Sequence, residues 1–141
     1  MFRSFLKPRH MLAAAAALVS ATLLAGPGCG AADDDVRLVT TAKLPNVPGK
    51  SITAIVVNYA PGGRSDKHHH AGSVLAYVLS GEIRSENSAT GPATVYKAGE
   101  SFFEPPDSKH LVSENASATE SASLLAIFIA DDGATLTTYY K

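Results

Sequence analysis

The fold of this chain is decided by residues 62–81, which read GGRSDKHHHAGSVLAYVLSG. A glycine-rich turn leads into three consecutive histidines, and a strongly apolar run follows between Gly72 and Gly81. Alternate side chains of a β-strand share a face, so His68 and His70 point together while His69 points away. Two imidazoles on one face can approach a single metal ion, and a third ligand must then come from elsewhere in the chain.

The third histidine is found in residues 99–115, which read GESFFEPPDSKHLVSEN. His110 is the only histidine outside the triplet and the first 31 residues. It stands at the start of an expected strand, directly after a proline turn. The two stretches together predict a metal site made by His68, His70 and His110. A solvated histidine loop that binds metal only adventitiously, and an ordinary strand histidine at position 110, are the alternatives.

The rest of the chain after Val36 has the pattern of an all-β protein. Short runs rich in Val, Ile, Thr, Tyr and Phe are separated by Gly, Pro, Asn and Asp clusters, which is typical of strands. No helical periodicity is present. Spacing of this kind predicts a β-sandwich or barrel. The expected strands are residues 36–42, 51–59, 73–80, 82–85, 94–97, 101–104, 109–114, 123–130 and 135–140, with breaks that include Gly91-Pro92.

Several expected strands are apolar on both faces. In residues 73–80, Val74, Ala76 and Val78 point one way, and the intervening positions are also large and apolar. A strand that buries both faces needs a second layer outside the barrel. This favours a homodimer.

The N-terminus is typical of a signal peptide. Three basic residues precede an uninterrupted run of apolar and small residues over 11–25, which is shorter than the roughly 20 residues of a membrane-spanning helix. We expect residues 1–31 to be cleaved on export, residues 32–50 to form an N-terminal arm or strand, and residues 51–141 to form the barrel. The exported protein is then expected in the periplasm or outside the cell. A permanent membrane anchor and lipid attachment at Cys29 are the alternatives.

Charge and cysteine content exclude several classes of protein. The chain has 141 residues, 45% of them hydrophobic, and a net charge of −1. Cleavage after residue 31 removes three basic residues and no acidic one, which leaves −4. A mildly acidic domain has no general attraction for nucleic acid or anionic lipid. With one cysteine, Cys29, the chain cannot form an internal disulfide, so its stability must come from a packed core.

The two histidine stretches resemble the two sequence motifs of the cupin superfamily. Gly62-x5-His68-x-His70 with a later Gly81 is similar to the first motif, and Gly99-x5-Pro105-x-Asp107-x2-His110 with Asn115 is similar to the second. The family usually has glycine at the place of Asp107. The resemblance covers about residues 51–130 and implies a single jelly-roll β-barrel.

One departure from the family pattern concerns the metal ligands. The first motif usually contains a glutamate seven residues before its closing glycine, and this position is Val74 here. The resemblance therefore implies a site with three histidines. This pattern is also found among cupins, including some iron-dependent dioxygenases. Neutral imidazole suits Zn, Fe, Cu and Ni, and three protein ligands leave positions open for water, substrate or dioxygen. The expected cofactor is one divalent transition metal: Fe, Mn, Ni or Zn.

Glu104 is the candidate catalytic residue. It lies six residues before His110 and directly before Pro105, on a strand where it shares a face with Phe102. If that face is interior, Glu104 could hydrogen-bond a ligating histidine, orient a bound water, or act as a distant fourth ligand. The alternative is a carboxylate at a strand end that faces solvent.

These features predict an exported metal-binding protein that acts on a small molecule. The first hypothesis is a mononuclear Fe- or Mn-dependent dioxygenase, or a related enzyme, with a small organic substrate. The second is a non-catalytic module that binds a metal or small ligand, because the same fold serves both functions. A metal-free structural barrel is the third.

Overall fold

The computed structural model describes residues 35–141, which form ten β-strands and no helix. The expected signal peptide, Cys29 and the first residues of the arm lie outside the described residues. Within residues 35–141 no helix has the length and hydropathy to cross a membrane. The strands are β1 (Asp35–Lys43), β2 (Lys50–Tyr59), β3 (His68–His70), β4 (Ser73–Ser80), β5 (Glu82–Asn87), β6 (Gly91–Lys97), β7 (Ser101–Glu104), β8 (Lys109–Asn115), β9 (Ala122–Asp131) and β10 (Thr137–Tyr139).

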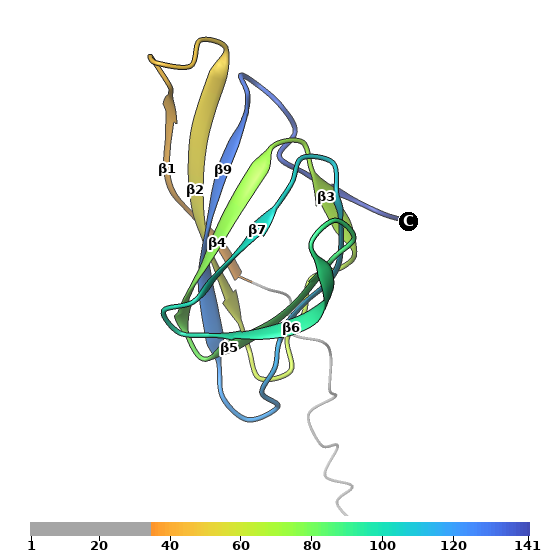
Figure 1. Cartoon of the computed structure of the whole chain (residues 1–141). Coiled ribbons are helices and arrows are strands. Elements are labelled where there is room, and N and C mark those ends of the chain that lie inside the picture. Colours follow the sequence, from red (N-terminus) through yellow and green to blue (C-terminus); the bar gives the residue numbers. More distant parts are fainter. Residues whose placement is uncertain (1–34) are drawn as a thin grey trace, which may run out of the picture.

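Two five-stranded antiparallel sheets face each other and enclose the core (Figure 1). The first sheet has the strand order β1-β2-β9-β4-β7, and the second has the order β10-β3-β8-β5-β6. Consecutive strands alternate between the sheets at several points, which is the arrangement of a jelly-roll barrel. The expected all-β fold is therefore confirmed.

The core lies between the sheets and follows the period of two that the sequence predicted. Along β4, Val74, Ala76 and Val78 are buried, whereas the residues between them are exposed. β9 repeats this alternation opposite β4, with Leu124, Ala126 and Phe128 inside. The inward face of the first sheet is thus a continuous apolar wall, and this wall forms one side of the site described below.

The structure extends or adds strands at places that the sequence pattern did not indicate. The histidine triplet is a strand of its own, β3, held between β8 and β10. Gly91-Pro92, expected to be a break, begins β6, where Gly91 has φ of 113° and pairs with Asn87. Because β6 is an edge strand, Pro92 does not disrupt the sheet's hydrogen bonding.

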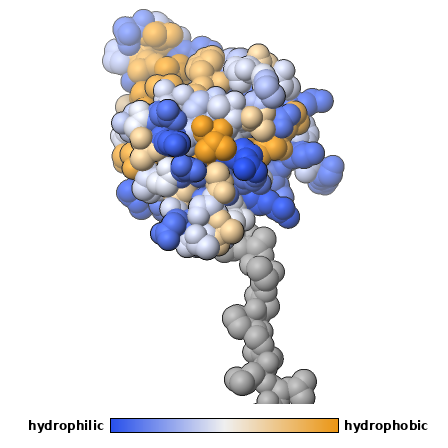
Figure 2. All heavy atoms as spheres, turned by 60° about the horizontal axis from the view of Figure 1, so that its bottom comes forward, coloured by the Kyte–Doolittle hydropathy of each residue, from blue (hydrophilic) through white to orange (hydrophobic). Residues whose placement is uncertain are grey.

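Apolar side chains remain exposed on the outer face of the first sheet. We call this set the outer apolar face; it comprises Leu75, Tyr77, Leu79, Phe103 and Ile129, each 42–49% exposed. On the face of the molecule drawn in Figure 2, hydrophobic residues occur in separate groups among hydrophilic ones. Within residues 35–141 no strand forms a second layer over the outer apolar face.

Candidate metal centre

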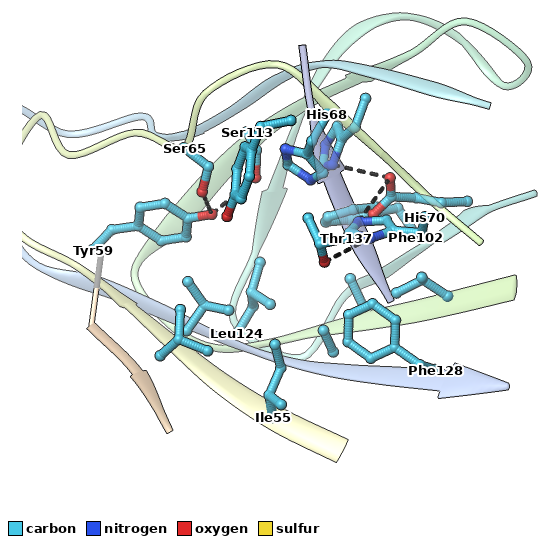
Figure 3. Close-up of a pocket in the computed structure, with 18 residues that line it drawn as sticks. Ile55, Tyr59, Ser65, His68, His70, Phe102, Ser113, Leu124, Phe128 and Thr137 are labelled. Carbon is cyan, nitrogen blue, oxygen red and sulfur yellow. Dashed lines mark hydrogen bonds and ion pairs between the residues drawn. The ribbon is translucent and has the colours of Figure 1, made fainter. Parts of the chain in front are cut away.

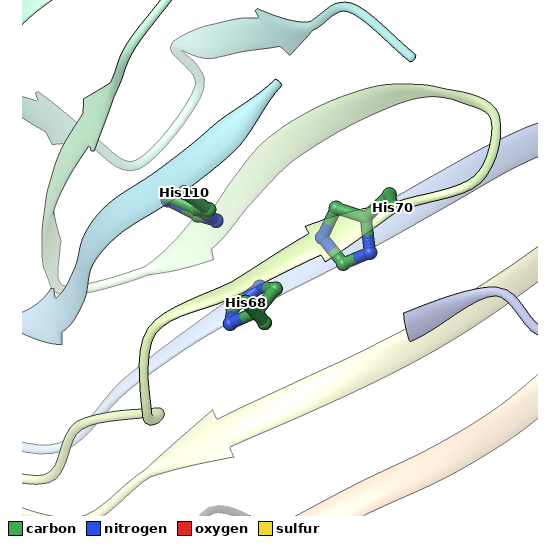
Figure 4. A group of neighbouring side chains, drawn as sticks. All are labelled: His68, His70 and His110. Atoms are coloured by element: carbon green, nitrogen blue, oxygen red, sulfur yellow. The ribbon is translucent and has the colours of Figure 1, made fainter. Parts of the chain in front are cut away.

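Three histidines from two strands converge inside the barrel. His68 and His70 come from β3 and His110 from β8, and His68 pairs directly with His110 across the two strands. Each side chain is buried, and one nitrogen of each ring lies within 4.8 Å of one nitrogen of each of the others. Figure 4 shows the three rings side by side. His69 points out of this cluster, as expected, and its ring packs against Tyr140 at a centroid distance of 5.4 Å.

Backbone carbonyls orient the two rings from β3. His68 Nδ1 lies 2.6 Å from the carbonyl oxygen of Asp66, and His70 Nδ1 lies 3.1 Å from that of Leu136. A carbonyl only accepts, so each Nδ1 carries a proton and donates it. In a neutral imidazole this leaves the lone pair on Nε2, which is the form that binds metal. The hydroxyl of Thr137, on β10, lies 3.2 Å from His70 Nδ1 and further fixes that ring.

His110 has the opposite orientation. Its Nε2 is hydrogen-bonded to Ser85 Oγ, on β5, at 2.9 Å. Its Nδ1 is buried and lies 2.9 Å from Glu104 Oε2, but without the alignment of a hydrogen bond. A buried nitrogen without a well-aligned partner costs free energy unless something binds it. A divalent ion between the three rings would satisfy this atom, so these residues fit the metal that the sequence implied.

Glu104 faces the cavity and not the solvent. Its side chain is buried, and Oε2 lies 3.9 Å from His70 Nε2 as well as close to His110. Asn87 Nδ2, on β5, donates a hydrogen bond to Oε2 at 3.3 Å. The carboxylate therefore lies at the histidine cluster, as expected for a residue that acts at the site.

Burial and charge shift the pKa values of two residues at the site, His70 and Glu104. Burial lowers the pKa of His70 from 6.5 to about 4, although the nearby Glu104 carboxylate opposes this. Burial would raise the pKa of Glu104, but the contact with His110 and the attraction of all three histidines outweigh it and hold that pKa below its usual range. His70 is thus ready to bind a metal at neutral pH without losing a proton.

The histidines and Glu104 line a cavity of about 100 Å³ whose other walls are mainly apolar. Figure 3 shows Phe102, Phe128, Leu124 and Ile55 around it. A second polar group lies toward one end: Tyr59 Oη is 2.9 Å from both Ser65 Oγ and Ser113 Oγ. The cavity therefore combines metal ligands, an apolar wall and a set of hydroxyls that can bind an oxygen atom of a small molecule.

Several of these residues were not found from the sequence. Ser85 and Asn87 lie on β5, where neither residue has a recognisable motif. They reach the site because β5 pairs with β8, which places Asn87 opposite His110. Thr137 reaches it because β10 pairs with β3. Only the strand register contains this information.

The turns that the two motifs predicted have the expected conformations. Gly62, Gly81 and Gly99 all have positive φ, as does Asp107 at 58°, the position where the family usually has glycine. The backbone N–H of Asp107 donates to the carbonyl of His70 at 2.8 Å. The turn between Glu104 and His110 is thereby tied to β3, which holds the other two histidines.

Solved structures similar to this chain share its fold at low sequence identity. A double-stranded β-helix protein from Klebsiella pneumoniae aligns with a TM-score of 0.60 and 20% identity, covering 79% of this chain and 89% of that one. An oxalate oxidase bound to the substrate analogue glycolate aligns with a TM-score of 0.58 and 20% identity, over 75% and 54% of the two chains. The DMSP lyase DddQ from Ruegeria pomeroyi gives 0.53 and 19%, over 62% and 42%.

The chain therefore spans only about half the length of these two enzymes. At these identities the likeness concerns the fold alone. No curated protein matches the chain. The family model of the cupin domain matches residues 55–128, which is more than half of the chain and includes all three histidines and Glu104. This match, the jelly-roll barrel and the two motifs agree: the chain belongs to the cupin family.

Proposed function

We propose that this protein is an exported, metal-dependent cupin enzyme, a mononuclear Fe or Mn dioxygenase or a related enzyme, with a small organic substrate. One observation supports it above all: three buried imidazoles and a buried carboxylate converge on a cavity whose remaining walls are mainly apolar. Burying four such groups is costly for a barrel that needs only to be stable. Perturbed titratable groups in a cavity are typical of catalytic sites.

The residues have separate roles in this proposal. His68, His70 and His110 would hold a divalent ion, which would supply Lewis-acid chemistry toward a chelating substrate and the activation of dioxygen. The apolar wall excludes water, Glu104 can accept the proton that a chelating enol or hydroxyl group loses, and the hydroxyl of Tyr59 can bind a second substrate oxygen. In a dioxygenase reaction one carbon–carbon bond of an enol or diketone breaks, and each product receives one atom of dioxygen.

The volume of the cavity limits the substrate. About 100 Å³ is small compared with the usual ligand pocket of roughly 300–1,000 Å³, so only a compact molecule fits without rearrangement. We therefore favour β-diketones, enols and small phenolic acids over polymers. These compounds can also chelate an ion through two oxygens.

Metal content and oxygen uptake test the proposal. Protein without a histidine tag is loaded in turn with Fe, Mn, Ni or Zn, and the metal is quantified after dialysis. We expect about one ion per chain, at least tenfold weaker binding in His110→Ala, and oxygen consumption with one of the compounds above. Wild-type protein that retains less than about 0.2 ion per chain would contradict the metal site.

The same experiment separates the enzyme from a binding module. Metal retained without oxygen uptake, across the whole compound panel and with each ion, would favour a cupin that binds a metal or small ligand without turnover. His69→Ala is the matched control because this histidine is adjacent in sequence but lies outside the cluster. Its metal content should equal that of the wild type.

The proposal includes export of the protein, and this part is supported by the sequence of residues 1–31. The basic head, the short apolar run and the small residues before position 32 predict cleavage after residue 31. Mass spectrometry of the protein recovered from the exported fraction tests this. A mature chain that begins at Cys29 and contains a lipid would instead show the lipoprotein alternative.

A further inference from the structure

The side chain opposite Glu104 is Val74, the residue at the position where the family usually has its acidic ligand. β4 and β7 are neighbours in the first sheet, and Val74 and Glu104 are direct partners in their register. Directly opposed residues of an antiparallel pair point to the same face, with Cβ atoms about 5 Å apart. Both side chains are buried and both line the cavity with the histidines.

The distances around Glu104 suit an ion shared with the histidines. For metal–ligand bonds of about 2.1 Å, two ligand atoms lie about 3.0 Å apart at right angles and about 4.2 Å apart when opposite. Glu104 Oε2 is 2.9 Å from His110 Nδ1 and 3.9 Å from His70 Nε2. The ligand nitrogens of the three histidines lie up to 4.8 Å apart, so the longest of these nitrogen–nitrogen distances must shorten by roughly half an ångström when an ion binds.

The surroundings of Glu104 lack another cation. Within residues 35–141 its ion-pair partners are His70 and His110, and no Lys or Arg contacts it. Its one conventional hydrogen bond to Oε2 comes from Asn87, at 3.3 Å. A buried carboxylate normally has a cation or several donors around it. A divalent ion among the imidazoles would supply that cation, and the carboxylate would in turn reduce the ion's buried charge from +2 to +1.

We propose that Glu104 is the fourth protein ligand of the metal, supplied from β7 in place of the missing glutamate on β4. The ligand set is then three histidines and one glutamate, with the carboxylate moved to the neighbouring strand. Oε2 binds the ion and Oε1 remains available to accept a proton. A carboxylate oxygen also favours Mn and Fe over softer ions, relative to three imidazoles alone. This inference rests on the proposed metal centre.

Moving the carboxylate back to β4 tests the inference. Mn²⁺ affinity is measured by titration calorimetry for the wild type, Glu104→Ala, Glu104→Gln and the double variant Val74→Glu/Glu104→Ala. We expect Glu104→Ala to weaken Mn²⁺ binding at least tenfold, Glu104→Gln to weaken it similarly, and the double variant to recover most of the loss. Glu82→Ala, which removes an exposed glutamate on β5, is the matched control and should leave affinity unchanged.

The outcomes distinguish this inference from the proposed function. Wild-type affinity in Glu104→Ala, together with loss of binding in His110→Ala, overturns the fourth ligand and leaves the metal centre intact. Equal affinity in all variants, His110→Ala included, overturns both. If the double variant folds but binds Mn²⁺ no more tightly than Glu104→Ala, a carboxylate at position 74 cannot replace the one at position 104 as a ligand, which contradicts the inference.

A second measurement does not depend on the folding of any variant. A crystal structure of the Mn-loaded wild-type protein gives the distance from the ion to the carboxylate directly. We expect Glu104 Oε2 at about 2.0–2.2 Å from the ion. A distance beyond about 3 Å, with water between them, would overturn the inference.

Discussion

The orientation of each imidazole at this site is set by hydrogen bonds to one of its ring nitrogens. Two rings donate to backbone carbonyls through Nδ1, whereas His110 is held through Nε2 by Ser85. The first two therefore present Nε2 to the centre and the third presents Nδ1. Because carbonyl oxygens belong to the backbone, a side-chain substitution can remove only the contacts of Ser85 with His110 and of Thr137 with His70.

Replacing Ser85 by alanine should weaken metal binding. The substitution leaves His110 Nε2 buried without a partner and frees the ring to rotate, so we expect a 10- to 100-fold loss of Mn²⁺ affinity. It should also cost about 1–3 kcal/mol in the free energy of unfolding. Ser113→Ala is the matched control, because this buried serine lines the same cavity but bonds to Tyr59. An equal effect of the two substitutions on affinity would argue against an orienting role for Ser85.

The metal-free protein should lose stability as the pH falls from 6.5 to 4. The pKa of His70 is lower in the folded chain, so the unfolded chain binds more protons in this range and stability rises with pH. The difference between 6.5 and about 4 corresponds to roughly 3 kcal/mol, lost fully below pH 4. Glu104, whose folded pKa is lowered, acts in the same direction, and its contribution disappears as the pH falls through that lowered value.

Thermal unfolding in the presence of a chelator measures this dependence. His70→Gln should flatten the change of melting temperature between pH 6.5 and 4, while His69→Gln should retain it. The assignment to His70 fails if both variants keep the slope of the wild type.

At the scale of the elements, three connections bring the site together. β3 lies between β8 and β10, β5 pairs with β8, and the turn from β7 to β8 is tied to β3 by the hydrogen bond from Asp107 to His70. The three histidines thus belong to two directly paired strands, β3 and β8, whereas Glu104 comes from β7 of the other sheet, at the start of the tied turn. The turn is the strained part of this arrangement, because Asp107 has a left-handed backbone at φ 58°.

The effect of a substitution at Asp107 on the free energy of unfolding should depend on the backbone freedom of the new residue more than on the loss of charge. Alanine in the left-handed region costs about 1–2 kcal/mol, while glycine adopts it freely at the expense of unfolded-state entropy. We expect Asp107→Gly to be more stable than Asp107→Ala by about 1 kcal/mol, measured by urea unfolding of the metal-free protein. Equal stabilities would show that the turn relaxes to another conformation in Asp107→Ala.

At the scale of the whole molecule, the outer apolar face remains to be covered. The five large apolar residues of this face are each more than two-fifths exposed. The apolar residues on both sides of their strands had predicted that both faces of these strands would be buried. We propose that a second copy of the chain covers this face. A stable interface buries about 800 Å² per partner, and a five-stranded sheet is of suitable size.

Light scattering after size-exclusion chromatography tests the dimer. We expect twice the mass of one chain for the wild type and the mass of one chain for Phe103→Glu, since a buried unpaired charge in an interface costs several kcal/mol. Val95→Glu, at an exposed apolar position of the second sheet, is the matched control and should remain dimeric. A wild-type mass of one chain would show that the outer apolar face is covered in some other way or remains exposed.

The sequence by itself determined the fold class, the inward face of the main strands and the three histidines. These follow from local rules: a period of two identifies a strand face, and glycine and proline mark the turns. The alternation of β4 and the convergence of His68, His70 and His110 agreed with these rules. The start of β6 at Gly91 did not, because only the position of β6 at a sheet edge permits Pro92 there.

Only the tertiary structure decided what surrounds the histidines. Strand register and pairing order place Glu104 opposite Val74. They also bring Ser85 to His110 and Thr137 to His70. Residues on different strands meet because the sheets close around a common core, and no local pattern in the chain records which positions will be opposite each other.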